Sequence, residues 1–144
     1  MNRVKQILFV VFTVISGSVI AQTNKHVALK VVVTGDMEQQ GSVLLALYDS
    51  EVDFLTKELI GNGLTATGNE LIFEFDSLKE GKHYAVAVFH DLNNNKKMDK
   101  NMFGIPSEPY AFGNNSMGFM GPPSFFDASI LLKPTDNVMV IKID

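Results

Sequence analysis

A run of acidic and amide side chains lies in the middle of this chain, between Phe89 and Pro109. These side chains follow the spacing D-x-N-x-N-x-x-x-D, and side chains at alternate positions of a tight loop can converge on one point. Hard cations such as Ca²⁺ take several oxygen ligands, from carboxylates, amides, backbone carbonyls and water. The spacing predicts a calcium loop formed by Asp91, Asn93, Asn95, the backbone carbonyl of Lys97, and Asp99.

Two positions depart from the calcium loop of helix-loop-helix proteins. The sixth place, which needs Gly for a sharp turn, is Lys96, and the twelfth place, usually a bidentate Glu, is Met102. Glu108 can replace that Glu only if the chain folds back. The predicted ligands carry little charge, so we expect a dissociation constant of about 10⁻⁴ to 10⁻³ M. The alternative is an Asn-rich surface loop whose side chains cap its own backbone.

Catalytic chemistry is weakly indicated. The chain has no Cys, and no nucleophile-elbow motif surrounds its serines. His90 next to Asp91 could act as a base, and Asp91 with Glu108 could form a pair of glycosidase carboxylates. The alternative function is therefore a hydrolase of an envelope or extracellular glycan or peptide that uses Asp91 and Glu108 or His90. We expect no enzymatic activity.

Residues 1–21 are typical of a secretory signal peptide. Arg3 and Lys5 give a positive start, an apolar run follows from Ile7 to Ile15, and Ala21 suits cleavage before Gln22. The apolar run is short for a membrane anchor. We therefore expect an exported protein, periplasmic or extracellular, with a single domain over residues 22–144 and no membrane span after cleavage. The formal net charge of −4 argues against nucleic acid and anionic membrane surfaces as partners.

Apolar residues alternate with polar ones along several segments separated by turn residues, which is the pattern of strands. We expect about seven strands and no long helix: His26–Thr34, Ser42–Tyr48, Leu64–Thr67, Glu70–Asp76, Ala85–Phe89, Ala128–Leu132 and Val138–Ile143. This order favours an all-β antiparallel sandwich of the immunoglobulin or transthyretin-like type. Tyr84 is expected to bond upstream backbone where the chain crosses between sheets, and Gly68-Asn69 to connect a hairpin.

Two of these strands, Ser42–Tyr48 and Tyr84–Phe89, are apolar in both phases, so both of their faces need a cover. The segment Met102–Asp127 is rich in Gly, Pro, Met and aromatic residues, which predicts a long but ordered loop. One interpretation is that this loop covers the second faces as a hydrophobic lid. The other is that it lines a ligand-binding groove with Glu108, Tyr110, Phe112, Phe119 and Phe125.

Four segments together resemble a known family. They are G-S-V-L-L-A-L-Y-D-S at 41–50, L-K-E-G-K-H-Y-A-V-A-V-F-H-D-L-N-N-N-K-K-M-D at 78–99, F-G-I-P-S-E-P-Y-A-F-G-N-N at 103–115, and G-P-P-S-F-F-D-A at 121–128. The chain resembles the DUF2141 family of exported bacterial proteins. That resemblance implies a small β-sandwich similar to transthyretin-like and carboxypeptidase-regulatory-like modules, without assigned catalytic residues. Family members usually have Gly where this chain has Lys96.

These observations predict a non-catalytic binding or structural module of the cell envelope, with a weak Ca²⁺ loop. The expected partner is a glycan, a peptide or an envelope protein. Exposed rings at Tyr110 or Phe119 would favour the binding function. Burial of both rings, with no open groove, would oppose it.

Overall fold

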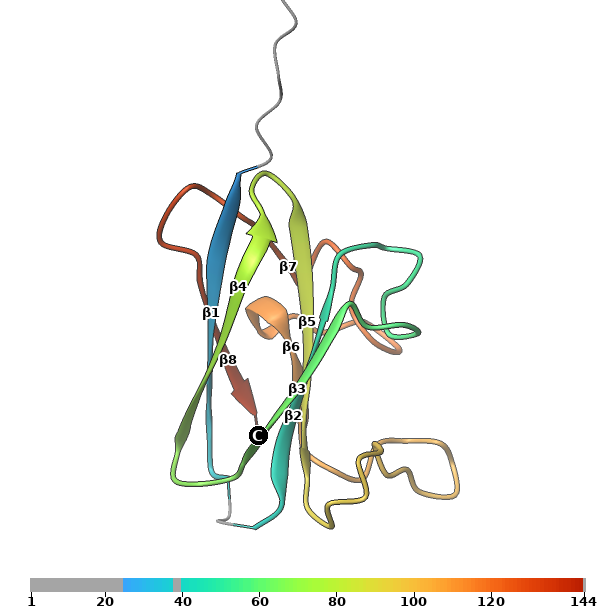
Figure 1. The fold of residues 1–144 in the computed structure, drawn as a ribbon. Helices are drawn as coiled ribbons and strands as arrows, with labels where there is room; N and C mark the ends of the chain where they lie inside the picture. Colours follow the sequence, from blue (N-terminus) through green and yellow to red (C-terminus); the bar gives the residue numbers. More distant parts are fainter. Residues whose placement is uncertain (1–24, 38–39, 144) are drawn as a thin grey trace, which may run out of the picture.

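The computed structural model describes residues 25–37 and 40–143. It is a sandwich of two β-sheets (Figure 1). Its strands are β1 (His26–Gly35), β2 (Ser42–Tyr48), β3 (Ile60–Thr65), β4 (Glu70–Lys79), β5 (His83–Asp91), β6 (Tyr110–Phe112), β7 (Ser129–Leu131) and β8 (Val138–Ile143), with a short 3-10 turn, η1 (Gly113–Asn115), after β6. The predicted signal peptide lies outside the described residues, among which no helix is long and apolar enough to cross a membrane.

The predicted all-β sandwich is confirmed, with small differences. The first sheet has the strand order β4-β1-β8, and the second has β3-β2-β5, with β6 and β7 both paired to β5. The described residues form eight strands rather than seven, because β6 lies inside the segment expected to be a loop. All neighbouring strands are antiparallel except β1 and β8, which run parallel.

The main core lies between the sheets and follows from the period-two pattern. On β4 the side chains of Leu71, Phe73 and Phe75 are buried, whereas Ile72 between them is 43% exposed. Val43, Leu45 and Leu47 of β2 and Tyr84, Val86 and Val88 of β5 face the same core. The opposite face of β2 and β5 is therefore free to carry other contacts.

Two connections test the predicted topology. The Tyr84 hydroxyl accepts a hydrogen bond from the backbone N–H of Lys79 at 3.0 Å, which confirms the expected tyrosine corner between the sheets. The hairpin predicted at Gly68-Asn69 is wrong, because β3 pairs with β2 and β4 pairs with β1. β3 ends at Thr65, and Ala66 is buried in the main core, so residues 66–69 carry the chain from one sheet to the other.

A second, smaller core covers one end of the outer face of the second sheet. Its buried members are Tyr48, Ala85, Phe112, Phe125 and Ala128. Phe54, from the loop after β2, packs edge-on against it, with ring centroids 5.3 Å from Tyr48 and 5.9 Å from Phe125. The long segment thus supplies part of the cover expected of it, and the rest of this face stays open.

Candidate functional site

Asp91 stabilises the Asn-rich loop that follows β5 by accepting hydrogen bonds from the backbone of that loop. It ends β5, and its side chain is fully buried. One carboxylate oxygen accepts the backbone N–H of Asn95 at 3.1 Å, and the other accepts that of Lys96 at 2.7 Å. A buried carboxylate that accepts two backbone N–H bonds stabilises the loop conformation around it.

Glu108 holds the same loop from the other side. The chain folds back after the loop, and Glu108 is 6% exposed. Its two carboxylate oxygens accept the backbone N–H groups of Leu92 at 2.9 Å and Asp99 at 3.0 Å. This is the fold-back that the calcium prediction required, but both oxygens are engaged with backbone.

The amide side chains complete a self-bonded loop. Asn93 and Asn95 donate through their side-chain amides to the two carboxylate oxygens of Asp99, at 2.6 and 2.9 Å. Their side-chain carbonyls accept the backbone N–H groups of Asn95 and Lys97, at 3.0 and 2.8 Å. Lys96 takes a φ of 61°, which is the left-handed conformation that Gly supplies in calcium loops. The side chains of Asp91, Asn93, Asn95 and Asp99 are thus brought together, and calcium binding stays a prediction.

His90 is also engaged. Its side chain is 1% exposed, and its Nε2 lies 2.6 Å from the backbone oxygen of Gln40. Asp91, Glu108 and His90 are therefore the three buried polar groups at this end of β5. Glu108 lines a small cavity of about 530 Å³ together with Tyr110 and Ser116, whereas Asp91 and His90 line neither this cavity nor the larger one on the outer face of the second sheet.

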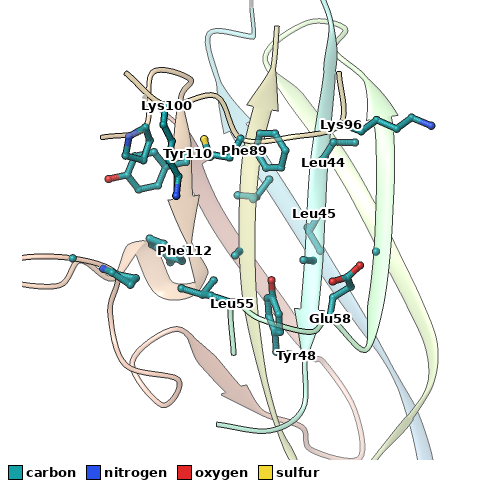
Figure 2. A pocket seen from close by; sticks show the side chains of 18 of the residues that line it. Leu44, Leu45, Tyr48, Leu55, Glu58, Phe89, Lys96, Lys100, Tyr110 and Phe112 are labelled. Carbon is teal, nitrogen blue, oxygen red and sulfur yellow. The ribbon is translucent and has the colours of Figure 1, made fainter. Parts of the chain in front are cut away.

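An open trough of about 1260 Å³ crosses the outer face of the second sheet (Figure 2). Its floor follows from strand register, because Ala46 of β2 lies between Gly61 of β3 and Ala87 of β5. These three small residues form one row across three strands. A bulkier row runs beside it, made of Gly63, Leu44, Phe89 and Tyr110. The small row leaves a depression next to the bulky one.

Two loops form the walls of the trough. One wall carries Met98, Lys100, Ile105 and Pro106 from the segment after β5, and the other carries Met117, Met120 and Pro122. In Figure 1 these loops project from the outer side of the second sheet. The second core closes one end of the face, and the remaining floor is accessible from outside.

The predicted groove residues divide into two groups. Tyr110 lines the trough and is 38% exposed, and Phe112 lines it from the second core. Phe119 is fully exposed on the loop that forms one wall. Phe125 is buried in the second core and does not line the trough, and Glu108 binds loop backbone instead.

Sequence reasoning missed most of the floor. Leu44, Ala46, Ala87 and Phe89 line the trough, and all four are half-buried. The available signal was the alternation of alanines in the outer phase of two strands that are apolar in both phases. Small residues at facing positions of neighbouring strands indicate a hollow, but only once the register is known.

The charges of the trough are placed at opposite corners. Lys100 lies beside Tyr110, whereas Glu58 lies across the trough near Tyr48, and Lys96 extends toward solvent (Figure 2). The ion pair that the described residues form is Lys82 with Asp49, so Lys100 has no carboxylate partner among them. Burial, and then the negative charge of Glu58, raises the pKa of the Tyr48 hydroxyl above its ordinary value.

Comparison with known proteins agrees with the sequence resemblance. Residues 31–140 match DUF2141, described as an uncharacterized protein conserved in bacteria. No curated protein and no solved structure gives a significant match. The matched region contains nearly all of the sandwich, from β1 to β8, including the loop and the trough. The chain belongs to the DUF2141 family.

Proposed function

We propose that this protein is a non-catalytic binding module of the cell envelope, and that its ligand site is the trough on the outer face of the β3-β2-β5 sheet. The observation that carries this proposal is an apolar sheet face that the chain leaves half uncovered. Leu44, Ala46 and Phe89 are only half-buried there, and Tyr110 is 38% exposed. Concave apolar sites with a few polar groups at their rim are the usual form of ligand sites.

The polar groups near the trough support a binding role over a catalytic one. A general acid, base or nucleophile must reach its substrate. Asp91, Glu108 and His90 are instead buried and do not line the trough: the carboxylate oxygens of both acids accept backbone N–H groups, and His90 Nε2 lies against the backbone oxygen of Gln40. These bonds give each group a structural role. The signal-peptide pattern of residues 1–21 supports export, so the ligand would be a glycan, a peptide or a partner protein segment met outside the cytoplasm.

The test is a binding screen read out residue by residue. Amide NMR spectra of the mature protein would be recorded with short oligosaccharides, with extended peptides and with single-chain amphiphiles. We expect at least one class to shift the amides of Ala46, Ala87 and Phe89 while Val31, in the other sheet, stays unchanged. Absence of shifts from all three classes, or shifts confined to the other sheet, would contradict the proposal.

Calcium binding is the second candidate function. The observation that favours it is the left-handed backbone of Lys96 together with the convergence of Asp91, Asn93, Asn95 and Asp99. Weak binding there would stabilise the loop that forms one wall of the trough. Its test is the calcium-dependent melt described in the Discussion.

A further inference from the structure

Lys100 is the charged group best placed to meet a ligand in the trough. It lines the cavity beside Tyr110, on the wall formed by the segment after β5 (Figure 2). The acids of that segment, Asp91, Asp99 and Glu108, are all engaged in hydrogen bonds within the loop. Lys100 therefore presents an ammonium group at the edge of an apolar floor, without an ion-pair partner in the described part of the chain.

The charged lining of the trough is positive in a protein whose net charge is negative. Two lysines, Lys96 and Lys100, line it against a single acid, Glu58, whereas the whole chain carries a formal charge of −4. Glu58 lies at the corner opposite Lys100 (Figure 2). This arrangement favours an anionic group at the Lys100 end and disfavours one at the Glu58 end, so it sets a direction for the ligand.

We propose, building on the binding function above, that the trough takes an anionic amphiphile: a molecule with one acyl or alkyl chain and a single carboxylate, phosphate or sulfate group. The acyl or alkyl chain of this ligand lies across the strands, over the small-residue row of Gly61, Ala46 and Ala87. The anionic group pairs with Lys100 and receives a hydrogen bond from the Tyr110 hydroxyl.

The floor itself separates this ligand from a glycan. The central row of the floor presents methyl groups and glycine, with no side-chain donor or acceptor. A sugar laid across it would lose hydrogen bonds to water without replacement, which is costly. An alkyl chain loses none, and each buried methylene contributes about 0.8 kcal/mol. At the β3 edge Gly61 has no side chain, but Glu58 Cγ and Oε1 lie next to it, so the apolar end of the ligand stops at Glu58.

The experiment is a calorimetric titration with three probes that share a decyl chain: decanoate, decyl maltoside and decyltrimethylammonium, all below their micelle concentrations. We expect decanoate to bind most tightly and the cationic probe least tightly. In Lys100→Gln the affinity for decanoate should fall about tenfold, as expected for loss of one charge-assisted hydrogen bond, while decyl maltoside binds as before. A second measurement, sedimentation with phosphatidylglycerol vesicles, distinguishes binding of a single amphiphile from binding to an anionic membrane surface.

The control is Lys79→Gln, which removes an exposed charge at the end of β4, outside the trough. It should bind decanoate as the unaltered protein does. Equal affinity for all three probes, an equal loss in both lysine variants, or binding to vesicles without binding of monomeric decanoate would overturn the proposal.

If the amphiphiles do not bind but an oligosaccharide or peptide shifts the trough amides, the proposed ligand class is wrong and the proposed binding site stands. If no class shifts them, both fail.

Discussion

The two ends of one sheet face are built differently. At one end of the outer face of the β3-β2-β5 sheet, Tyr48, Phe112 and Phe125 pack edge-on around Phe54 and cover the sheet. At the other end, Leu44 and Phe89 form a half-buried apolar floor beside Tyr110, and Phe103 and Phe119 on the flanking loops are 81% and 100% exposed.

This difference separates a part of the face that stabilises the fold from a part that we propose binds a ligand. The closed end buries its rings, so it contributes to folding in the usual way. The open end keeps apolar surface in contact with water, although the neighbouring loops carry side chains able to cover it. A contiguous exposed apolar patch of this kind marks an interaction site. The proposed function therefore assigns one half of the face to the core and the other half to a ligand site.

The largest expected effect comes from removing a ring at each end. Phe125→Ala empties the closed end and should lower the free energy of unfolding by about 3–5 kcal/mol. Phe89→Ala, at the half-buried open end, should cost about 1 kcal/mol. Urea denaturation of both variants measures the difference. Equal losses would mean that the open end is ordinary core.

The next effect concerns the loop that supports the trough wall. Glu108→Gln replaces one accepting oxygen by a donor that faces the backbone N–H of Leu92 or Asp99. The unfolding free energy should fall by about 1–3 kcal/mol, because a buried N–H loses its acceptor. Glu74→Gln, on an exposed position of β4, is the matched control and should change stability little. A Glu108→Gln variant as stable as this control would remove the proposed role.

Calcium should stabilise that wall by a smaller amount. With a dissociation constant of about 10⁻³ M, about 10 mM Ca²⁺ adds about 1.4 kcal/mol, which corresponds to a rise of about 5 °C in melting temperature. Asp99→Asn should abolish this rise, and Asp76→Asn, exposed on β4, should keep it. A melt in EDTA identical to the melt in Ca²⁺ would establish the loop as one closed by its own hydrogen bonds alone.

The smallest effect belongs to Tyr48, at the boundary between the two ends. Its pKa is raised in the folded protein by burial and by Glu58, so the hydroxyl remains protonated in the fold after it has ionised in the unfolded chain. Stability from this group is complete below pH about 10 and is lost as the pH rises above that value. Tyr48→Phe should show a shallower loss of stability in alkaline denaturation. An unchanged slope would contradict this assignment.

The sequence predicts local features of this fold better than long-range ones. Alternating residues predict β1, β4 and β8, a continuous apolar run predicts β2, and the backbone bond of Tyr84 is predicted correctly as well. The strand β6 is not predicted. It has only three residues, it lies in a segment rich in glycine and proline, and its pairing with β5 is a long-range contact that local pattern does not indicate. The crossing after β3 was missed because a Gly-Asn turn does not specify which sheet follows.

The candidate site shows the same division. Asp91, Asn93, Asn95 and Asp99 come together as predicted, since their spacing within one loop brings them together. The trough was not predicted as such, because its floor needs Gly61, Ala46 and Ala87 to be in register across three strands. Such a register depends on pairing between distant segments, which local periodicity does not determine.

The central claim is that the open end of this face is a ligand site, and Ala46→Phe tests it most directly. Ala46 is half-buried on the floor and packs against the second core, so a larger ring fills the depression on the outer face without entering the main core. The variant should melt at or above the temperature of the unaltered protein and should lose the decanoate-induced amide shifts at Ala87 and Phe89. Val140→Phe, on the exposed outer face of β8, should keep them. Retention of full decanoate binding by Ala46→Phe would contradict the account.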